Sequence, residues 1–177
     1  MRIRTLTILA FCIFTTATQA EEKTENPFKT AKVGDWISYK SFTKGFPIEI
    51  TTKQTVVAAT EKEITIEMVS TVDKKEGKPT KMVIDLTKPY DTAANTGAAK
   101  VEVKKLDSGK ETITINDKKY ECTWIKNKAT IKVGDKEFTS ETKAWICKDV
   151  PLNGVVRTEI ISDLSNTIME MTDFGRK

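Results

Sequence analysis

Apolar and polar residues alternate with a period of two along most of the chain. Ile64, Ile66 and Met68 would share one face of an extended segment, and Thr, Val and Ile dominate such segments. This spacing and composition are typical of β-strands with one buried face. The pattern predicts strands at residues 33–39, 48–57, 64–72, 82–86, 101–103, 113–115, 120–124, 131–133, 138–147, 155–161 and 168–174.

Short segments rich in Gly, Asn, Asp and Ser separate the predicted strands. We expect turns at 73–78, Ser108-Gly109, Asn116-Asp117 and Asn153-Gly154. The last of these is the strongest hairpin signal, because both residues tolerate the positive φ that a two-residue primed turn requires. Most connections between strands should therefore be short.

The predicted fold class is all-β, with a single antiparallel meander of about ten strands and little helix apart from the signal peptide described below. Residues 89–100 include four alanines, but Asn95, Thr96 and Gly97 interrupt them, so we expect a loop with at most one helical turn. Each strand has one apolar and one polar face. A sheet of this kind must curl or be covered to bury its apolar face, which predicts a half-barrel, a barrel or a sandwich.

The N-terminus has the three parts of a secretory signal peptide. Arg2 and Arg4 precede the apolar run Leu6 to Phe14, and small or polar residues follow as far as Ala20. The apolar run is too short to span ~30 Å of hydrocarbon as a helix. We expect export with cleavage after residue 20, in preference to an uncleaved anchor or to lipidation at Cys12. The mature protein would then lie in the periplasm or at the cell surface.

Three regions follow from this interpretation: the signal peptide at 1–20, a polar N-terminal tail at 21–32, and a single β domain at 33–177. The tail either moves freely or threads across the domain through Phe28. The mature chain has no further apolar run long enough for a transmembrane helix. Its oligomeric state is left open.

The charge balance gives no indication of nucleic-acid binding. The chain has 29 Lys and Arg against 25 Asp and Glu, and removal of Arg2 and Arg4 lowers the net charge from +4 to +2. The remaining basic residues are nearly all Lys and are interspersed with acidic residues. A nucleic-acid surface favours a clustered field and arginine forks.

Two cysteines remain after the predicted cleavage, Cys122 and Cys147. In an exported protein such a pair is expected to form a disulfide. The two residues are 25 apart, which is unlike the Cys-x-x-Cys spacing of redox sites. Closing a loop of this length would stabilise the fold by roughly 3 to 3.5 kcal/mol.

The sequence lacks the usual residues of an active site. It contains no His, which removes the common general base and the commonest transition-metal ligand. It has no phosphate-binding glycine loop and no Gly-x-Ser-x-Gly motif. We expect no enzyme activity, no cofactor and no metal, although a carboxylate-based envelope hydrolase stays open as a lesser alternative.

Four aromatic residues are the candidate ligand-binding residues: Trp36, Tyr120, Trp124 and Trp145. Tyr120 and Trp124 flank Cys122 on one face of a predicted strand, and Trp145 lies two residues before Cys147. A disulfide between the two strands would gather these aromatic residues around it. They would either line a pocket for an apolar ligand or pack as ordinary core. Trp36 shares its face with the small residues Gly34 and Ser38, so it is either a binding residue or a cover over the sheet.

Three segments carry a resemblance to known proteins: Val33-Gly34-Asp35-Trp36-Ile37-Ser38-Tyr39, the stretch from Glu111 to Trp124, and Lys143 to Val156. Together they resemble a group of uncharacterised bacterial secreted proteins that also end in Asp-Phe-Gly. The Trp, Val-Pro and Gly-Val-Val pattern is similar to that of half-barrels of the lipoprotein-carrier (LolA/LolB-like) type. That resemblance implies a curved sheet whose apolar concave face is closed by helices and holds lipid or acyl chains. Only residues 89–100 offer a helix here.

The function that these observations favour is an exported, non-enzymatic protein that binds an apolar or amphipathic, lipid-like ligand on a curved β-sheet. The alternative is a structural or protein-interaction module of the cell envelope with a solid core.

Overall fold

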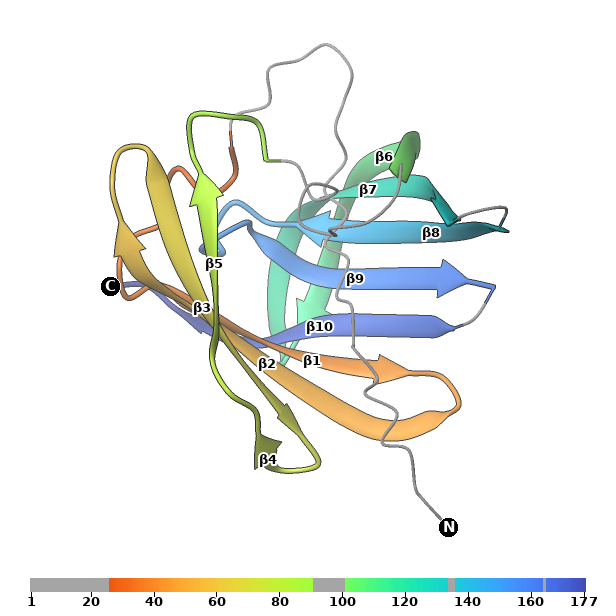
Figure 1. Ribbon diagram of the computed structural model, residues 1–177, viewed down its shortest axis with the longest axis horizontal. Helices are drawn as coiled ribbons and strands as arrows, with labels where there is room; N and C mark the ends of the chain where they lie inside the picture. The colour runs from red at the N-terminus through yellow and green to blue at the C-terminus, as the bar shows by residue number, and fades with distance from the viewer. Residues whose placement is uncertain (1–25, 91–100, 134–135, 164) are drawn as a thin grey trace.

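Ten antiparallel strands form one sheet in the computed structural model, which describes residues 26–90, 101–133, 136–163 and 165–177 (Figure 1). The strands are β1 (Trp36–Thr43), β2 (Phe46–Ala59), β3 (Glu63–Val72), β4 (Lys75–Glu76), β5 (Thr80–Asp85), β6 (Val101–Ile115), β7 (Lys118–Val133), β8 (Lys136–Ile146), β9 (Val155–Ser162) and β10 (Asn166–Gly175).

The sheet is curled like a half-barrel and is not closed (Figure 1). Its strand order is β4-β3-β2-β1-β10-β9-β8-β7-β6, and β5 pairs with β3 on the same side as β4. The C-terminal strand β10 therefore lies at the centre, between β1 and β9. The predicted all-β meander is confirmed, and of the predicted shapes the half-barrel is the one adopted. No helix occurs in the described residues, so none of them forms an apolar helix that could cross a membrane.

Strands β6 and β7 are longer than the sequence pattern predicts. The predicted turn at Ser108-Gly109 is wrong, because both residues lie within β6 and pair with β7. The pairing of β6 with β7 is instead interrupted by a bulge between Lys105 and Asp107. Asn116 and Asp117 form the predicted turn after β6, with φ values of 48° and 62°.

The predicted two-residue turn at Asn153-Gly154 is also wrong. Strands β8 and β9 are joined by residues 147–154, and the positive φ values fall on Leu152 and Gly154. The backbone N–H of Cys147 donates to the carbonyl of Gly154, and a Cβ on Gly154 would lie 2.7 Å from the Cys147 carbonyl oxygen. A glycine is needed at position 154 because a side chain there would meet this carbonyl. The disulfide at Cys147 links the start of the loop to β7.

Two predicted features lie outside the described residues. They are the signal peptide at 1–20 and most of the alanine-rich segment 89–100, of which only Pro89 and Tyr90 are described.

Strand register divides the sheet into two faces. Residues paired across strands share a face, and neighbours along a strand alternate. We call the side that carries Tyr39 the tyrosine face and the side that carries Trp36, Trp124 and Trp145 the tryptophan face. The largest fully buried strand residues, such as Ile37, Ile64 and Met171, lie on the tyrosine face, which is therefore the side around which the sheet curls.

Tyr39 connects β1 to β9 across the curled sheet. Its side chain has no exposed surface, and its hydroxyl donates to the Val155 carbonyl oxygen on β9 at 2.9 Å, reaching past β10. Burial raises the pKa of the Tyr39 hydroxyl far above its usual range, so the group stays neutral and acts as a donor.

Residues 26–32 pack against one end of this core. Phe28 is only 2% exposed and meets the ring of Tyr90 edge-on, with a centroid distance of 5.0 Å. The side-chain amide of Asn26 donates to the carbonyl oxygens of Asp85 and Lys88, and its oxygen accepts from the Phe28 N–H. These bonds anchor the segment beside the end of β5.

Candidate functional site

Three of the four candidate aromatic residues meet on the tryptophan face. Trp124 on β7 pairs directly with Trp145 on β8, and Tyr120 lies on the same side of β7. Trp145 is 5% exposed, whereas Tyr120 and Trp124 are partly buried against the core. Gly109 on β6 lies beneath Trp124, where a Cβ would approach the indole ring to 2.9 Å. The indole therefore lies flat against β6.

The space beside the two indole rings is filled by Lys143. Its Nζ lies 4.5 Å from the ring centre of Trp124 and 4.3 Å from that of Trp145. The Nζ also contacts Glu111 Oε2 at 3.3 Å. This lysine occupies the position that a ligand between the indoles would need. The sequence pattern of the aromatic residues did not predict this contact.

The predicted disulfide is confirmed. Cys122 on β7 and Cys147 just after β8 are bonded, with their Cα atoms 4.6 Å apart and exposures of 3% and 2%. The bond lies where the β7–β8 ladder would continue beyond the pair Thr123 and Ile146. It fixes the start of the 147–154 loop next to the aromatic residues.

One row of paired residues crosses nine strands on the tryptophan face, from β4 to β6. It consists of Glu76, Thr71, Thr51, Lys40, Glu170, Arg157, Trp145, Trp124 and Gly109. Near its middle, Arg157 binds Glu159 at 2.7 Å and Glu170 at 3.2 Å. Both carboxylates are thus ion-paired to one guanidinium.

Trp36 lies apart from the other aromatic candidates, at the start of β1. It pairs with Gly175 on β10, where a Cβ would come within 2.3 Å of the indole Nε1, and Lys53 Nζ lies 4.6 Å from the ring centre. The ring is half-buried and lies against the backbone of β10. The structure therefore does not join Trp36 to the cluster around the disulfide.

The tyrosine face changes character between its two ends. Around Phe28 and Tyr39 it carries large, fully buried side chains. Toward the tips of the β1–β2 and β9–β10 hairpins its apolar side chains are only partly buried, and this group comprises Ile50, Ile125, Ile131, Ile160, Val101 and Val103. Apolar surface on the inner side of the curl is thus left partly open to solvent.

Asn127 lies in the middle of this partly open region. Its side chain is 1% exposed, and Oδ1 has no hydrogen-bond partner among the described residues. Thr142 on β8 pairs with it on one side and Lys105 on β6 on the other. Lys105 is half-buried and makes no ion pair with the described residues. A buried acceptor without a partner costs about 1–3 kcal/mol, so a water or a ligand that donates to Oδ1 would be stabilising here.

Asn127 was not among the sequence candidates, although the sequence held a signal for it. It occupies an apolar position of the alternation, between Ile125 and Ala129. A polar residue at a position where the alternation places apolar residues is expected to face the core. Among the described residues no cluster of three or more His, Cys, Asp or Glu could hold a metal ion.

Comparison with known proteins finds likeness only among solved structures. No protein-family model matches the chain, and no curated protein matches it in sequence. One similar structure is a protein from Bacteroides fragilis NCTC 9343 described as exported and of YmcC-like fold. It is 14% identical, with 84% of this chain and 99% of that chain covered and a TM-score of 0.56.

A second similar structure is a protein from Parabacteroides distasonis ATCC 8503 described as a lipoprotein. It is 13% identical, with 84% of this chain and 98% of that chain covered and a TM-score of 0.54. LprF from Mycobacterium bovis aligns more loosely, at 10% identity over 80% of this chain and 86% of its own, with a TM-score of 0.37. At these identities the first two likenesses establish one thing: the chain shares their fold.

Proposed function

We propose that this is an exported, non-enzymatic binding protein that holds an amphipathic, lipid-like ligand on the inner side of its curled sheet. Asn127 is the observation that carries the proposal. An unpaired acceptor, 1% exposed and surrounded by partly exposed isoleucines, suits a ligand that has both an apolar chain and a hydrogen-bond donor.

The row around Asn127 suggests the chemistry of the ligand's polar end. Asn127 Oδ1 would accept from a hydroxyl or ammonium group, and Lys105 would meet an anionic oxygen. The half-buried side chains of Ile125, Ile131 and Ile160 would contact the acyl chain. A single-chain phospholipid such as lysophosphatidylethanolamine carries all three features.

The location of the protein in the cell envelope is part of the proposal. Export is supported by the predicted signal peptide and by the two solved structures of this fold, which are described as exported and as a lipoprotein. The buried disulfide suits the same compartment, because exported proteins fold under oxidising conditions.

Replacing Asn127 with Leu separates a binding role from a structural one. Removal of an unpaired buried acceptor should leave stability unchanged or raise it, since Asn127 Oδ1 has no partner among the described residues. The affinity for lysophosphatidylethanolamine, measured by native mass spectrometry below the micelle concentration, should fall about fivefold or more. Asn166→Leu, at an exposed position on β10, is the matched control and should bind like the native protein.

Equal affinity of the native protein and Asn127→Leu would remove Asn127 from the site. If the native protein binds no lysophospholipid and carries no lipid when purified from the periplasm, the ligand proposal fails. The alternative of an envelope interaction module with a solid core would then be favoured.

A further inference from the structure

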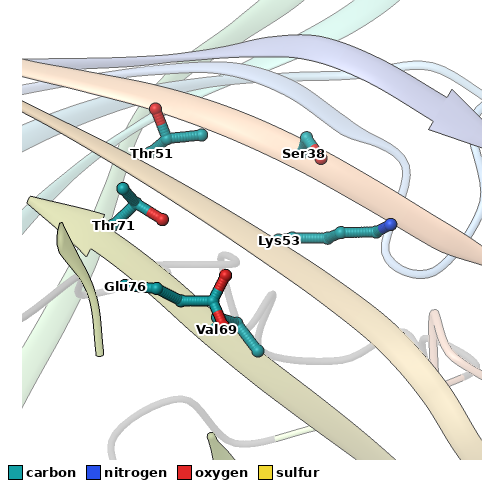
Figure 2. Close-up of a pocket in the computed structure, with 6 residues that line it drawn as sticks. All are labelled: Ser38, Thr51, Lys53, Val69, Thr71 and Glu76. Carbon is teal, nitrogen blue, oxygen red and sulfur yellow. The ribbon is translucent and has the colours of Figure 1, made fainter. Parts of the chain in front are cut away.

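A groove of about 310 Å³ crosses the tryptophan face over strands β1 to β4, on the side of the sheet opposite Asn127 (Figure 2). Two neighbouring register rows line it. One consists of Ser38, Lys53 and Val69, and the other contains Thr51, Thr71 and Glu76. The groove therefore runs across the strands, and it is open because several of its side chains are short.

The side-chain polar groups of this groove make no hydrogen bond or ion pair with the described residues, although Lys53 lies over the ring of Trp36. The hydroxyls of Ser38, Thr51 and Thr71 make no side-chain hydrogen bond with any described residue, and Lys53 and Glu76 form no ion pair among those residues. Elsewhere on the same face charges are matched, as in Lys143–Glu111 and Arg157–Glu170. The groove thus offers an ammonium group, a carboxylate and three hydroxyls that make no hydrogen bond or ion pair with the described residues.

An aromatic ring lies beside one of the groove's lining residues, Lys53. Trp36 is two residues before Ser38 on the same face of β1, and Lys53 Nζ lies 4.6 Å from its ring centre. Gly175 allows the indole to lie against β10, because any larger residue would meet the ring. One face of the ring is held by the backbone, so the ring is fixed in orientation.

We propose that this groove binds a saccharide. A sugar ring presents hydroxyls that both donate and accept, which matches the Ser and Thr hydroxyls, the Lys53 ammonium and the Glu76 carboxylate. Its C–H groups pack on the Trp36 indole once the Lys53 side chain, whose Nζ lies 4.6 Å from the ring centre, moves from the ring to a sugar hydroxyl. Val69 is the one apolar residue among those that line the groove, and the methyl groups of Thr51 and Thr71 add further apolar surface. Its volume lies at the lower end of ligand sites, so one or two sugar units of a glycan fit it.

The proposal does not rest on a ligand at Asn127, because the two sites lie on opposite faces of the sheet. It is tested with ¹⁵N-labelled protein and three trisaccharides, built from glucose, N-acetylglucosamine and galacturonic acid. Binding of at least one should shift the backbone amide resonances of Ser38, Thr51 and Thr71. The resonance of Asn127 should stay unchanged.

Valine at Thr51 and Thr71 removes two hydroxyls and keeps the β-branched shape that strands favour. The double variant T51V/T71V should bind the saccharide about tenfold more weakly. The matched control T112V/T114V changes two exposed threonines of β6 and should bind normally. Lys53→Met should also weaken binding of the saccharide, and Lys104→Met is its control. If T51V/T71V does not fold, Lys53→Met provides the test in its place.

Two results would overturn the proposal. The first is that none of the three saccharides shifts the amide resonances of the groove at about 10 mM. The second is that binding occurs but is unchanged in both T51V/T71V and Lys53→Met, which would place it elsewhere.

Discussion

The indole Nε1 of Trp145 on β8 donates a hydrogen bond of 2.9 Å to Glu111 Oε2 on β6, reaching past the intervening strand β7. Lys143 contacts the same oxygen at 3.3 Å. These two hydrogen bonds hold the pKa of the Glu111 carboxyl below its usual range, and the bond from Trp145 has the larger effect. One acidic side chain thus connects the edge strand to the aromatic cluster.

Glu111→Gln should make the stability of the protein less sensitive to acid. A carboxyl with a lowered folded-state pKa stabilises above its unfolded pKa of about 4.3, and this contribution is lost as the pH falls through the folded pKa. The thermal midpoint of the native protein should therefore fall more steeply below about pH 4 than that of Glu111→Gln.

The control for this measurement is Glu102→Gln, an exposed glutamate on the same strand that forms no ion pair with the described residues. It should follow the native profile. Parallel profiles for the native protein and Glu111→Gln would show that the contact with Trp145 does not contribute to folding.

Reduction of the disulfide should destabilise the protein without changing its fold. The chain-entropy model gives roughly 3 to 3.5 kcal/mol for the loop closed by Cys122 and Cys147. Urea denaturation with and without reductant measures the loss, and the double variant C122A/C147A should be indifferent to reductant. A native protein whose urea midpoint ignores reductant would contradict the bond's stabilising role.

Phe28→Ala should lower the free energy of unfolding by about 3–5 kcal/mol, because it empties a buried position at the end of the core. Phe46→Ala is the matched control, since Phe46 is 55% exposed, and it should change stability by no more than about 0.5 kcal/mol. Similar urea midpoints for the two variants would mean that residues 26–32 do not stay packed on the sheet in solution.

Gly175→Ala should destabilise the protein through Trp36 specifically. The added Cβ would overlap the indole, which predicts a cost of about 1–3 kcal/mol. The cost should largely disappear in a Trp36→Ala background, so a double-mutant cycle measures the contact. Additive effects of the two substitutions would show that the ring does not lie on β10.

The alternation of residues predicted the strands well because strand character is local. It also placed Cys122 and Cys147 on strands, and the structure shows that β7 and β8 are neighbours, with the disulfide joining Cys122 to Cys147 just after β8. The continuity of β6 through Gly109 was missed, because the glycine is there to accommodate Trp124 and a packing glycine looks like a turn glycine in sequence.

The contacts that define the sites depend on strand order, which alternation does not encode. Trp36 meets Gly175 because the C-terminal strand inserts beside β1, and Glu111 meets Trp145 through a pairing of three strands. Lys143 appears in sequence as one more surface lysine, yet it lies between two indoles. These relationships follow from tertiary register and needed the structure.

The most direct measurement of the central claim is a methyl NMR titration with isoleucine-labelled protein and lysophosphatidylethanolamine below its micelle concentration. The account predicts shifts of the Ile125, Ile131 and Ile160 methyls on the tyrosine face, together with nuclear Overhauser contacts to the acyl chain. Ile113, packed near the aromatic cluster, should stay unchanged. Unperturbed methyls on the tyrosine face, or shifts confined to Ile113, would contradict it.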